Sequence, residues 1–153
     1  MEYLGHIVSH EGVKVDSNKI KSIKEFKIPK TLRNLRGFLR LTWYYHKFVQ
    51  NYGIIIAPLT ILLKKYTFFF TPEETKPFEH LKEAMCQVPD LAMPDFTKTI
   101  IVECDGSRNG IGAILMQDEK TIAFKSHPIK ERYLHKAIYE KEMLAIPHAL
   151  KKW

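Results

Sequence analysis

The main change in the hydrophobic pattern of the chain lies near residue 95, and this change limits the folds open to it. Before that point, apolar residues recur mainly at helical spacing. From Thr99 onwards, three apolar stretches separated by tight-turn sequences are typical of strands: "TIIVECD", "GIGAILMQ" and "KTIAFKS". The prolines of the linker "VPDLAMPDF" disfavour helix between the two parts. We therefore predict an α+β fold, in which a helical part precedes a three-stranded antiparallel meander and a last helix from about Ala137 towards Trp153.

The helical part carries signals for a hairpin and four helices. "YLGHIVSHEGVKV" predicts a short hairpin that turns at "HEG". Capping residues and prolines set the expected helix ends. The expected helices are one capped by Asp16 that ends before Pro29, one capped by Thr31 from Leu32 to about Asn51 and closed by Gly53, one with Pro58 in its first turn, and one capped by Thr71.

The positive charge is concentrated in the first part of the chain. Residues 1–65 hold 12 Lys and Arg against 4 Asp and Glu, whereas residues 66–153 hold 12 against 13. A basic half of this kind is expected where a protein meets a polyanion such as nucleic acid. The alternative is a surface whose charge only aids solubility.

A helical wheel divides the expected helix over residues 32–51 into two faces. One sector of about 80° collects four cations and one ring: Arg33, Arg36, Arg40, Tyr44 and Lys47. Apolar side chains lie broadly opposite. Such a stripe can follow a phosphate backbone, with the tyrosine able to stack on a base or sugar. An ordinary solvated helix face remains the alternative.

Asp105 and Glu142 form a candidate acid pair. Asp105 ends the first strand of the meander, and Glu142 lies in the last helix, in "YEKEMLAI". If this helix packs on the sheet, the two carboxylates can approach each other and offer the oxygen ligands that Mg²⁺ prefers. Two-metal cleavage of a phosphodiester normally uses three or four carboxylates, so two are too few. The alternative is a pair of surface or capping groups.

Other features restrict the class of protein. Cys86 and Cys104 are not closely spaced, which fits a reducing compartment and predicts neither a disulfide framework nor a zinc module. "MEYLGHIVSH" does not resemble a secretory signal, and "IIIAPLTILL" is too short for a membrane span. We expect an intracellular protein, cytoplasmic or nuclear, without a membrane partner.

Four stretches of the sequence, in order, resemble blocks of the Pol polyprotein of gypsy-class LTR retrotransposons, of the kind abundant in plant genomes. They are "YLGHIVSHEGVKVDSNKIKSI", "LRNLRGFLRLTWYYHKFVQNYGIIIAPLTILLKK", "LAMPDFTKTIIVECDGSRNGIGAILMQ" and "YEKEMLAIPHALKKW". The resemblance covers essentially the whole chain. It implies a reverse transcriptase thumb and connection followed by the N-terminal part of a ribonuclease H domain.

The resemblance assigns a part to each segment. Residues 1–15 would be the hairpin that steadies the primer, with Leu4 and Gly5 near its backbone. Residues 16–65 would be the thumb that holds an RNA–DNA hybrid or template–primer duplex, and residues 66–97 the connecting segment. Residues 98–153 would begin an incomplete ribonuclease H fold, in which Asp105 and Glu142 are catalytic Mg²⁺ ligands.

The sequence departs from the family pattern in ways that bear on activity. The polymerase aspartates and two further ribonuclease H carboxylates, with the other missing Pol segments, belong to parts of the family outside this chain. Arg40 and Trp43 stand where the family usually has glycine, and Pro77 and Pro147 fall inside expected helices. We expect a fragment without catalytic activity alone. The alternatives are a retained nucleic-acid-binding module and a piece of a longer active polyprotein.

Overall fold

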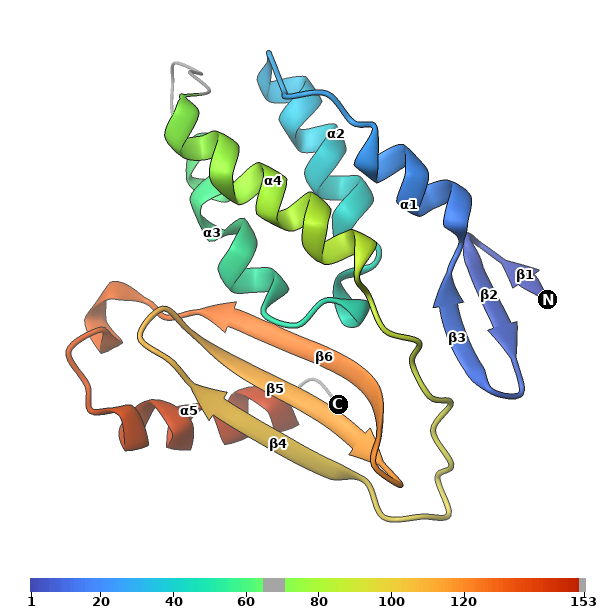
Figure 1. Cartoon of the computed structure of the whole chain (residues 1–153). Helices are drawn as coiled ribbons and strands as arrows, with labels where there is room; N and C mark the ends of the chain where they lie inside the picture. The colour runs from blue at the N-terminus through green and yellow to red at the C-terminus, as the bar shows by residue number, and fades with distance from the viewer. Residues whose placement is uncertain (65–70, 152–153) are drawn as a thin grey trace.

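The computed structural model describes residues 1–64 and 71–151, and its fold is α+β (Figure 1). The predicted boundary between residues 65 and 66 lies outside the described residues. Among the described residues, no helix is long and apolar enough to span a membrane. The elements are β1 (Glu2–Tyr3), β2 (His6–Ser9), β3 (Gly12–Val15), α1 (Ser17–Lys24), α2 (Leu32–Trp43), η1 (His46–Phe48), α3 (Tyr52–Leu62), α4 (Pro72–Cys86), β4 (Ile101–Gly106), β5 (Gly110–Gln117), β6 (Lys120–Pro128), η2 (Glu131–Tyr133) and α5 (Ile138–Leu150).

The N-terminal strands form an antiparallel sheet in the order β1-β2-β3. The predicted hairpin over β2 and β3 is confirmed, and β1 adds a third strand through a turn at Leu4 and Gly5. Asp16 then caps α1, because its carboxylate accepts a hydrogen bond from the backbone N–H of Asn18 at 2.9 Å. The start of this helix is therefore where the sequence placed it.

The predicted helix over residues 32–51 is wrong in length, because α2 ends at Trp43. Tyr45 leaves the helical region, with φ −104° and ψ 14°, and its ring is 2% exposed. Its hydroxyl donates to the carbonyl of Gly5 at 3.3 Å. Burying Tyr45 and Phe48 against the core thus replaces further helix with the short turn η1. Asn51, in the left-handed region at φ 59°, precedes the next helix.

Helix α3 also differs from its prediction. It begins at Tyr52, so Pro58 lies inside it and not in its first turn. Proline has no N–H, and the helical bond that it would donate to the carbonyl of Ile54 is missing. The helix nevertheless continues, because Leu59 and Leu62 on its inner face are 0% and 1% exposed and pack in the core. Tertiary packing overrides the local signal here.

One hydrophobic core joins the four N-terminal helices. The ring centroids of Phe38 and Phe78 are 4.6 Å apart, and those of Phe26 and Phe38 are 5.1 Å apart. Helix α4 supplies Phe78, Leu81 and Met85, each 0% exposed, and it runs through Pro77 as the sequence predicted. These buried side chains hold α2 with one face inward and the other toward solvent.

The predicted meander is confirmed as an antiparallel sheet in the order β4-β5-β6. Helix α5 contacts β4 and β5, while α3 and η1 contact β6, so the sheet lies between α5 and the helical part (Figure 1). Phe124 and Ile114 face the helical part and join its core. Ala145 of α5 is completely buried. The last helix therefore covers the opposite face of the sheet.

The linker between the two parts is pinned to both sheets. Val13 and Leu91 exchange backbone hydrogen bonds of 2.7 and 2.9 Å, and Ala92 donates to the carbonyl of Thr121 at 2.8 Å. The buried amide of Gln117 accepts from the backbone of Asp95 and donates back to it. Figure 1 shows this segment passing beside β3 before it reaches β4. It is an extended structural element of the fold.

Candidate functional site

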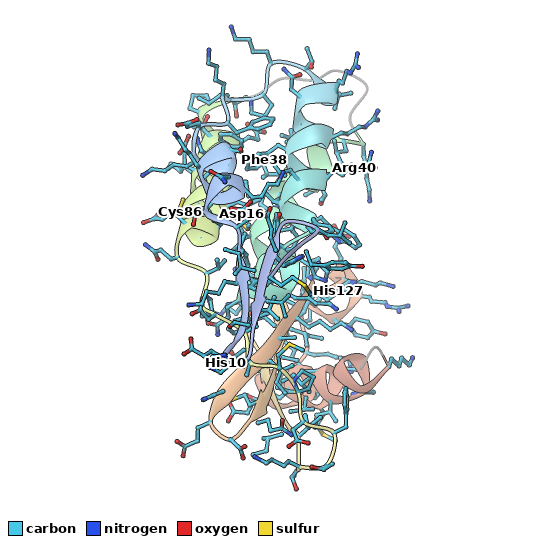
Figure 2. All side chains as sticks on the ribbon, turned by 90° about the vertical axis from the view of Figure 1, so that its right-hand side faces the viewer. His10, Asp16, Phe38, Arg40, Cys86 and His127 are labelled. Carbon is cyan, nitrogen blue, oxygen red and sulfur yellow. The ribbon has the colours of Figure 1, made fainter. Side chains whose placement is uncertain are left out.

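Helix α2 presents its arginines to solvent. Arg33, Arg36 and Arg40 are exposed on the face opposite to the fully buried Leu35 and Phe38. Figure 2 shows Arg40 on the outer side of α2 and Phe38 toward the neighbouring helices. The three arginines thus share one open face, as the sequence predicts for them.

Tyr44 and Lys47 are exposed but do not belong to the helix that was predicted to carry them. Tyr44 is the C-cap residue of α2, and Lys47 lies in η1. The predicted position of both residues on the helical wheel, within a helix over residues 32–51, is therefore wrong. Tyr44 still borders the arginine face, since it follows directly on the last turn of α2.

The turn at Leu4 and Gly5 is held against this end of α2. Both residues have positive φ, 49° and 79°. The hydroxyl of Tyr44 donates to the carbonyl of Leu4 at 2.9 Å. A Cβ on Gly5 would lie 2.7 Å from the hydroxyl of Tyr45, so glycine permits the close approach. The structure therefore brings the turn at Leu4 and Gly5 together with Tyr44, although Leu4 and Tyr44 are 40 residues apart in sequence.

Two residues of this contact were missed by the sequence reasoning. The ring of His6 lies 5.1 Å from that of Tyr44 and 5.3 Å from that of Tyr45, measured between centroids. Burial raises the pKa of the Tyr45 hydroxyl, which keeps it a neutral donor. The available signal was the adjacent pair Tyr44 and Tyr45. Neighbouring residues of a helix point about 100° apart, so when Tyr44 faces solvent the ring of Tyr45 can turn towards the core.

Asp105 is exposed and faces the helical side of the sheet. Its partner across the ladder is Gly112, and a Cβ on Gly112 would lie 3.1 Å from Oδ1 of Asn51. Paired residues point to the same face. Asp105 and Asn51 accordingly line one small pocket of about 120 Å³, together with Glu103. Asn51 and Glu103 were not predicted as site residues.

Glu142 lies on the other side of β4. A Cβ on Gly106 would lie 2.7 Å from the backbone nitrogen of Glu142, so Gly106 faces α5. Because side chains alternate along a strand, Asp105 faces away from α5. The structure brings the backbones of the two acids close together. Their side chains start on opposite faces of the sheet, and Glu142 is exposed.

The acid pair does not by itself make a magnesium site. Among the residues that the structure describes, no group of three or more His, Cys, Asp or Glu side chains could hold a metal ion. Asp105 on β4 and Glu142 on α5 supply one carboxylate each, which is a partial donor set for a dication that takes about six oxygen ligands. Burial raises the pKa of the neighbouring Cys104 thiol, which disfavours it as a nucleophile.

The family model described as "RNase H-like domain found in reverse transcriptase" matches residues 70–153, more than half of the chain. The chain belongs to this family.

Curated relatives extend the match to almost the whole chain. It is 40% identical over 151 residues to the "Retrovirus-related Pol polyprotein from transposon 297" of Drosophila melanogaster, covering 97% of this chain and 14% of that protein. It is 34% identical to the corresponding polyprotein from transposon gypsy, covering 99% of this chain and 16% of that protein. A 95-residue stretch is 47% identical to the "Uncharacterized mitochondrial protein AtMg00860" of Arabidopsis thaliana, covering 61% of this chain and 60% of that protein. The chain thus corresponds to a segment of retrotransposon Pol polyproteins and spans about a seventh of their length.

Solved structures agree on the fold. The foamy viral protease–reverse transcriptase in complex with an RNA/DNA hybrid superposes with a TM-score of 0.90 at 25% identity, covering 99% of this chain and 21% of that one. The same viral protein in complex with double-stranded DNA gives a TM-score of 0.91, also at 25% identity, over 99% of this chain and 33% of that one. The relative placement of helices and sheets is therefore that of a viral reverse transcriptase.

Proposed function

We propose that this chain is a nucleic-acid-binding segment of a retrotransposon reverse transcriptase, and that α2 holds an RNA–DNA hybrid or a template–primer duplex. The observation that carries the proposal is the open row of Arg33, Arg36 and Arg40, bordered by the turn at Leu4 and Gly5. Three guanidinium groups on one helix face suit the regularly spaced phosphates of a duplex. The similar viral structures in complex with a hybrid and with double-stranded DNA support this choice of ligand.

The proposal divides the chain by role. Residues 1–15 would contact the primer strand, residues 16–65 would act as the thumb, residues 66–97 would connect, and residues 98–153 would contribute the first part of a ribonuclease H domain. The Arabidopsis relative supports a plant source. As part of a retrotransposon protein, the chain would work inside the cell, in the cytoplasm or nucleus.

For the parent protein we propose RNA-directed DNA synthesis and Mg²⁺-dependent cleavage of RNA in hybrids. Asp105 and Glu142 would each contribute one carboxylate to the metal ligands of that cleavage site. The chain alone would bind hybrids without cutting them, because the described part of the chain supplies only a partial donor set. The second candidate function, a retained nucleic-acid-binding module, would likewise bind hybrids without cutting them.

The test is the affinity of the chain for a fluorescent RNA–DNA hybrid, measured by anisotropy over a series of salt concentrations. Replacing Arg33, Arg36 and Arg40 by alanine should weaken binding and lower the slope of log K against log salt by about 3. The matched control removes three exposed lysines elsewhere on the surface: Lys76, Lys120 and Lys130.

The control has the same change in net charge, so it separates a local interface from general attraction. The proposal requires a larger loss in the arginine variant than in the lysine variant. Equal losses in the two variants, or no binding by the wild-type chain at low salt, would refute it.

A further inference from the structure

A second cavity lies between the helical part and the sheet, and its lining includes neither Asp105 nor the three arginines. Its volume is about 400 Å³, which is within the range of small-ligand sites. Its apolar wall includes Ile56 and Ala57 of α3 and Phe124 of β6. The bond from the backbone N–H of Gly53 to Oγ of Ser126, 2.7 Å long, ties these two walls together. The cavity is thus built from elements that are fixed to each other.

Two stacked aromatic rings, those of Trp43 and His46, line this cavity. Trp43 is 60% exposed and lies parallel to His46, with ring centroids 5.0 Å apart and planes 19° apart. Nδ1 of His46 is 2.6 Å from the carbonyl oxygen of Trp43. A carbonyl oxygen only accepts, so Nδ1 carries the hydrogen and this bond orients the imidazole ring. The indole, which stacks on this imidazole, is therefore a large and accessible aromatic surface.

The residues around the cavity favour an anion. Among the described residues that line it are Lys47 and two histidines, His46 and His127, and no aspartate or glutamate. A site whose described lining offers an aromatic plane, an apolar wall and a cation, but no carboxylate, suits a ligand that is both planar and negatively charged. Nucleotides have this combination, since every base has a stackable face and the phosphate can pair with a lysine.

We propose that this cavity binds a nucleoside monophosphate unit, with the base on the indole of Trp43 and the phosphate beside Lys47. The unit could be a free nucleotide or an unpaired nucleotide of a strand held on α2. Trp43 lies about 60° around the helix axis from Arg40, so a strand that follows the arginines can reach it. Only this second source rests on the proposed function.

The experiment uses the full chain and its tryptophan fluorescence. The sequence has two tryptophans, so a Trp153→Phe variant leaves Trp43 as the reporter. Adenosine 5′-monophosphate should quench this signal saturably. Adenosine and ribose 5-phosphate, which each lack one half of the ligand, should bind about tenfold more weakly.

Two substitutions separate the contributions of base and phosphate. Lys47→Gln should reduce the affinity for the nucleotide to that for adenosine. For Trp43, binding is followed by calorimetry: Trp43→Ala should lower the affinity about tenfold, while Trp43→Phe keeps most of it. Since Trp43 is mostly exposed, the alanine variant should remain folded, and circular dichroism checks this.

A single-stranded oligonucleotide distinguishes the two sources. If it responds to Trp43→Ala and the free nucleotide does not bind, the unit comes from a bound strand. Nucleotide binding that survives replacement of Arg33, Arg36 and Arg40 supports the cavity even if hybrid binding fails. If neither the nucleotide, up to about 10 mM, nor the oligonucleotide responds to Trp43→Ala, the proposal is overturned.

Discussion

Replacing Gly106 by alanine tests the contact that places Glu142 beside β4. The new Cβ would lie 2.7 Å from the nitrogen of Glu142 and 2.8 Å from the carbonyl carbon of Lys141. Ordinary contacts of this kind begin at 3.4 Å, so the start of α5 must move by about 0.7 Å. Both obstructing atoms belong to the backbone and cannot rotate away. We expect the free energy of unfolding to fall by about 2 kcal/mol, as overpacking usually costs.

The assay is thermal unfolding, combined with hydrogen exchange of the α5 and β4 amides. A loss of about 2 kcal/mol corresponds to a fall of about 4–8 °C in Tm for a chain of this size. Exchange should increase in α5 and β4 and remain unchanged in α1 and α2, which are distant from the substitution.

Gly37 provides the matched control, since a Cβ there would meet nothing within 4 Å. The same change from glycine to alanine should therefore stabilise the protein by about 0.5–1 kcal/mol through helix propensity. If Gly106→Ala leaves Tm and the exchange of α5 unchanged, the helix does not pack on Gly106. The placement of Glu142 would then be wrong.

Three further outcomes follow from buried or capping groups and from the acid pair. Burial raises the pKa of Tyr52 from 10.0 to about 12, so the stability from its neutral hydroxyl is complete below pH 10 and is lost as pH rises towards 12. Tyr52→Phe also loses the 3.0 Å bond to Thr42, so it should lower the free energy of unfolding by about 1 kcal/mol at pH 7, as measured by urea unfolding. Between pH 10 and 12 this variant should lose less stability than the wild type. Asp16→Ala should cost about 1 kcal/mol in the same assay, whereas Asp16→Asn should retain most of the cap; equal losses would contradict the capping role. With Mg²⁺ and a labelled hybrid, the purified chain should give no cleavage on a denaturing gel, and cleavage that Asp105→Asn abolishes would contradict the partial donor set.

Local signals predicted most of the fold. Asp16 and the three strands of the meander were found because caps, tight turns and strand residues act over a few positions. The length of α2 was not predicted, because the helix ends where Tyr45 bonds to Gly5. This contact joins residues 40 positions apart, and the hydrophobic periodicity of a single helix gives no information about it. Pro58 was misplaced for a similar reason, since the packing of α3 in the core outweighs the missing helical bond.

The candidate site was predicted in part for the same physical reasons. The arginine face of α2 follows from helical spacing alone, and its exposure agrees with the wheel. The relation of Asp105 to Glu142 depends on which face of β4 the last helix covers. Gly106 carried this information, because a glycine next to an acidic strand end allows a helix backbone to approach closely. Asn51 gave no comparable signal.

The arginine face of α2 and the acidic end of β4 are held in a fixed position relative to each other. Gly53 bonds to Ser126 on β6, a Cβ on Gly110 would lie 2.3 Å from the side chain of Ile54, and Ala92 bonds to Thr121. These contacts join α3 and the linker to the sheet at separate points, so rotation of the helical part against the sheet would break several of them together. A duplex bound on α2 would therefore meet the end of β4 at a set position. Because charge removal on α2 leaves these contacts intact, such variants should change affinity without changing stability, whereas Gly106→Ala should change both stability and the position of Glu142.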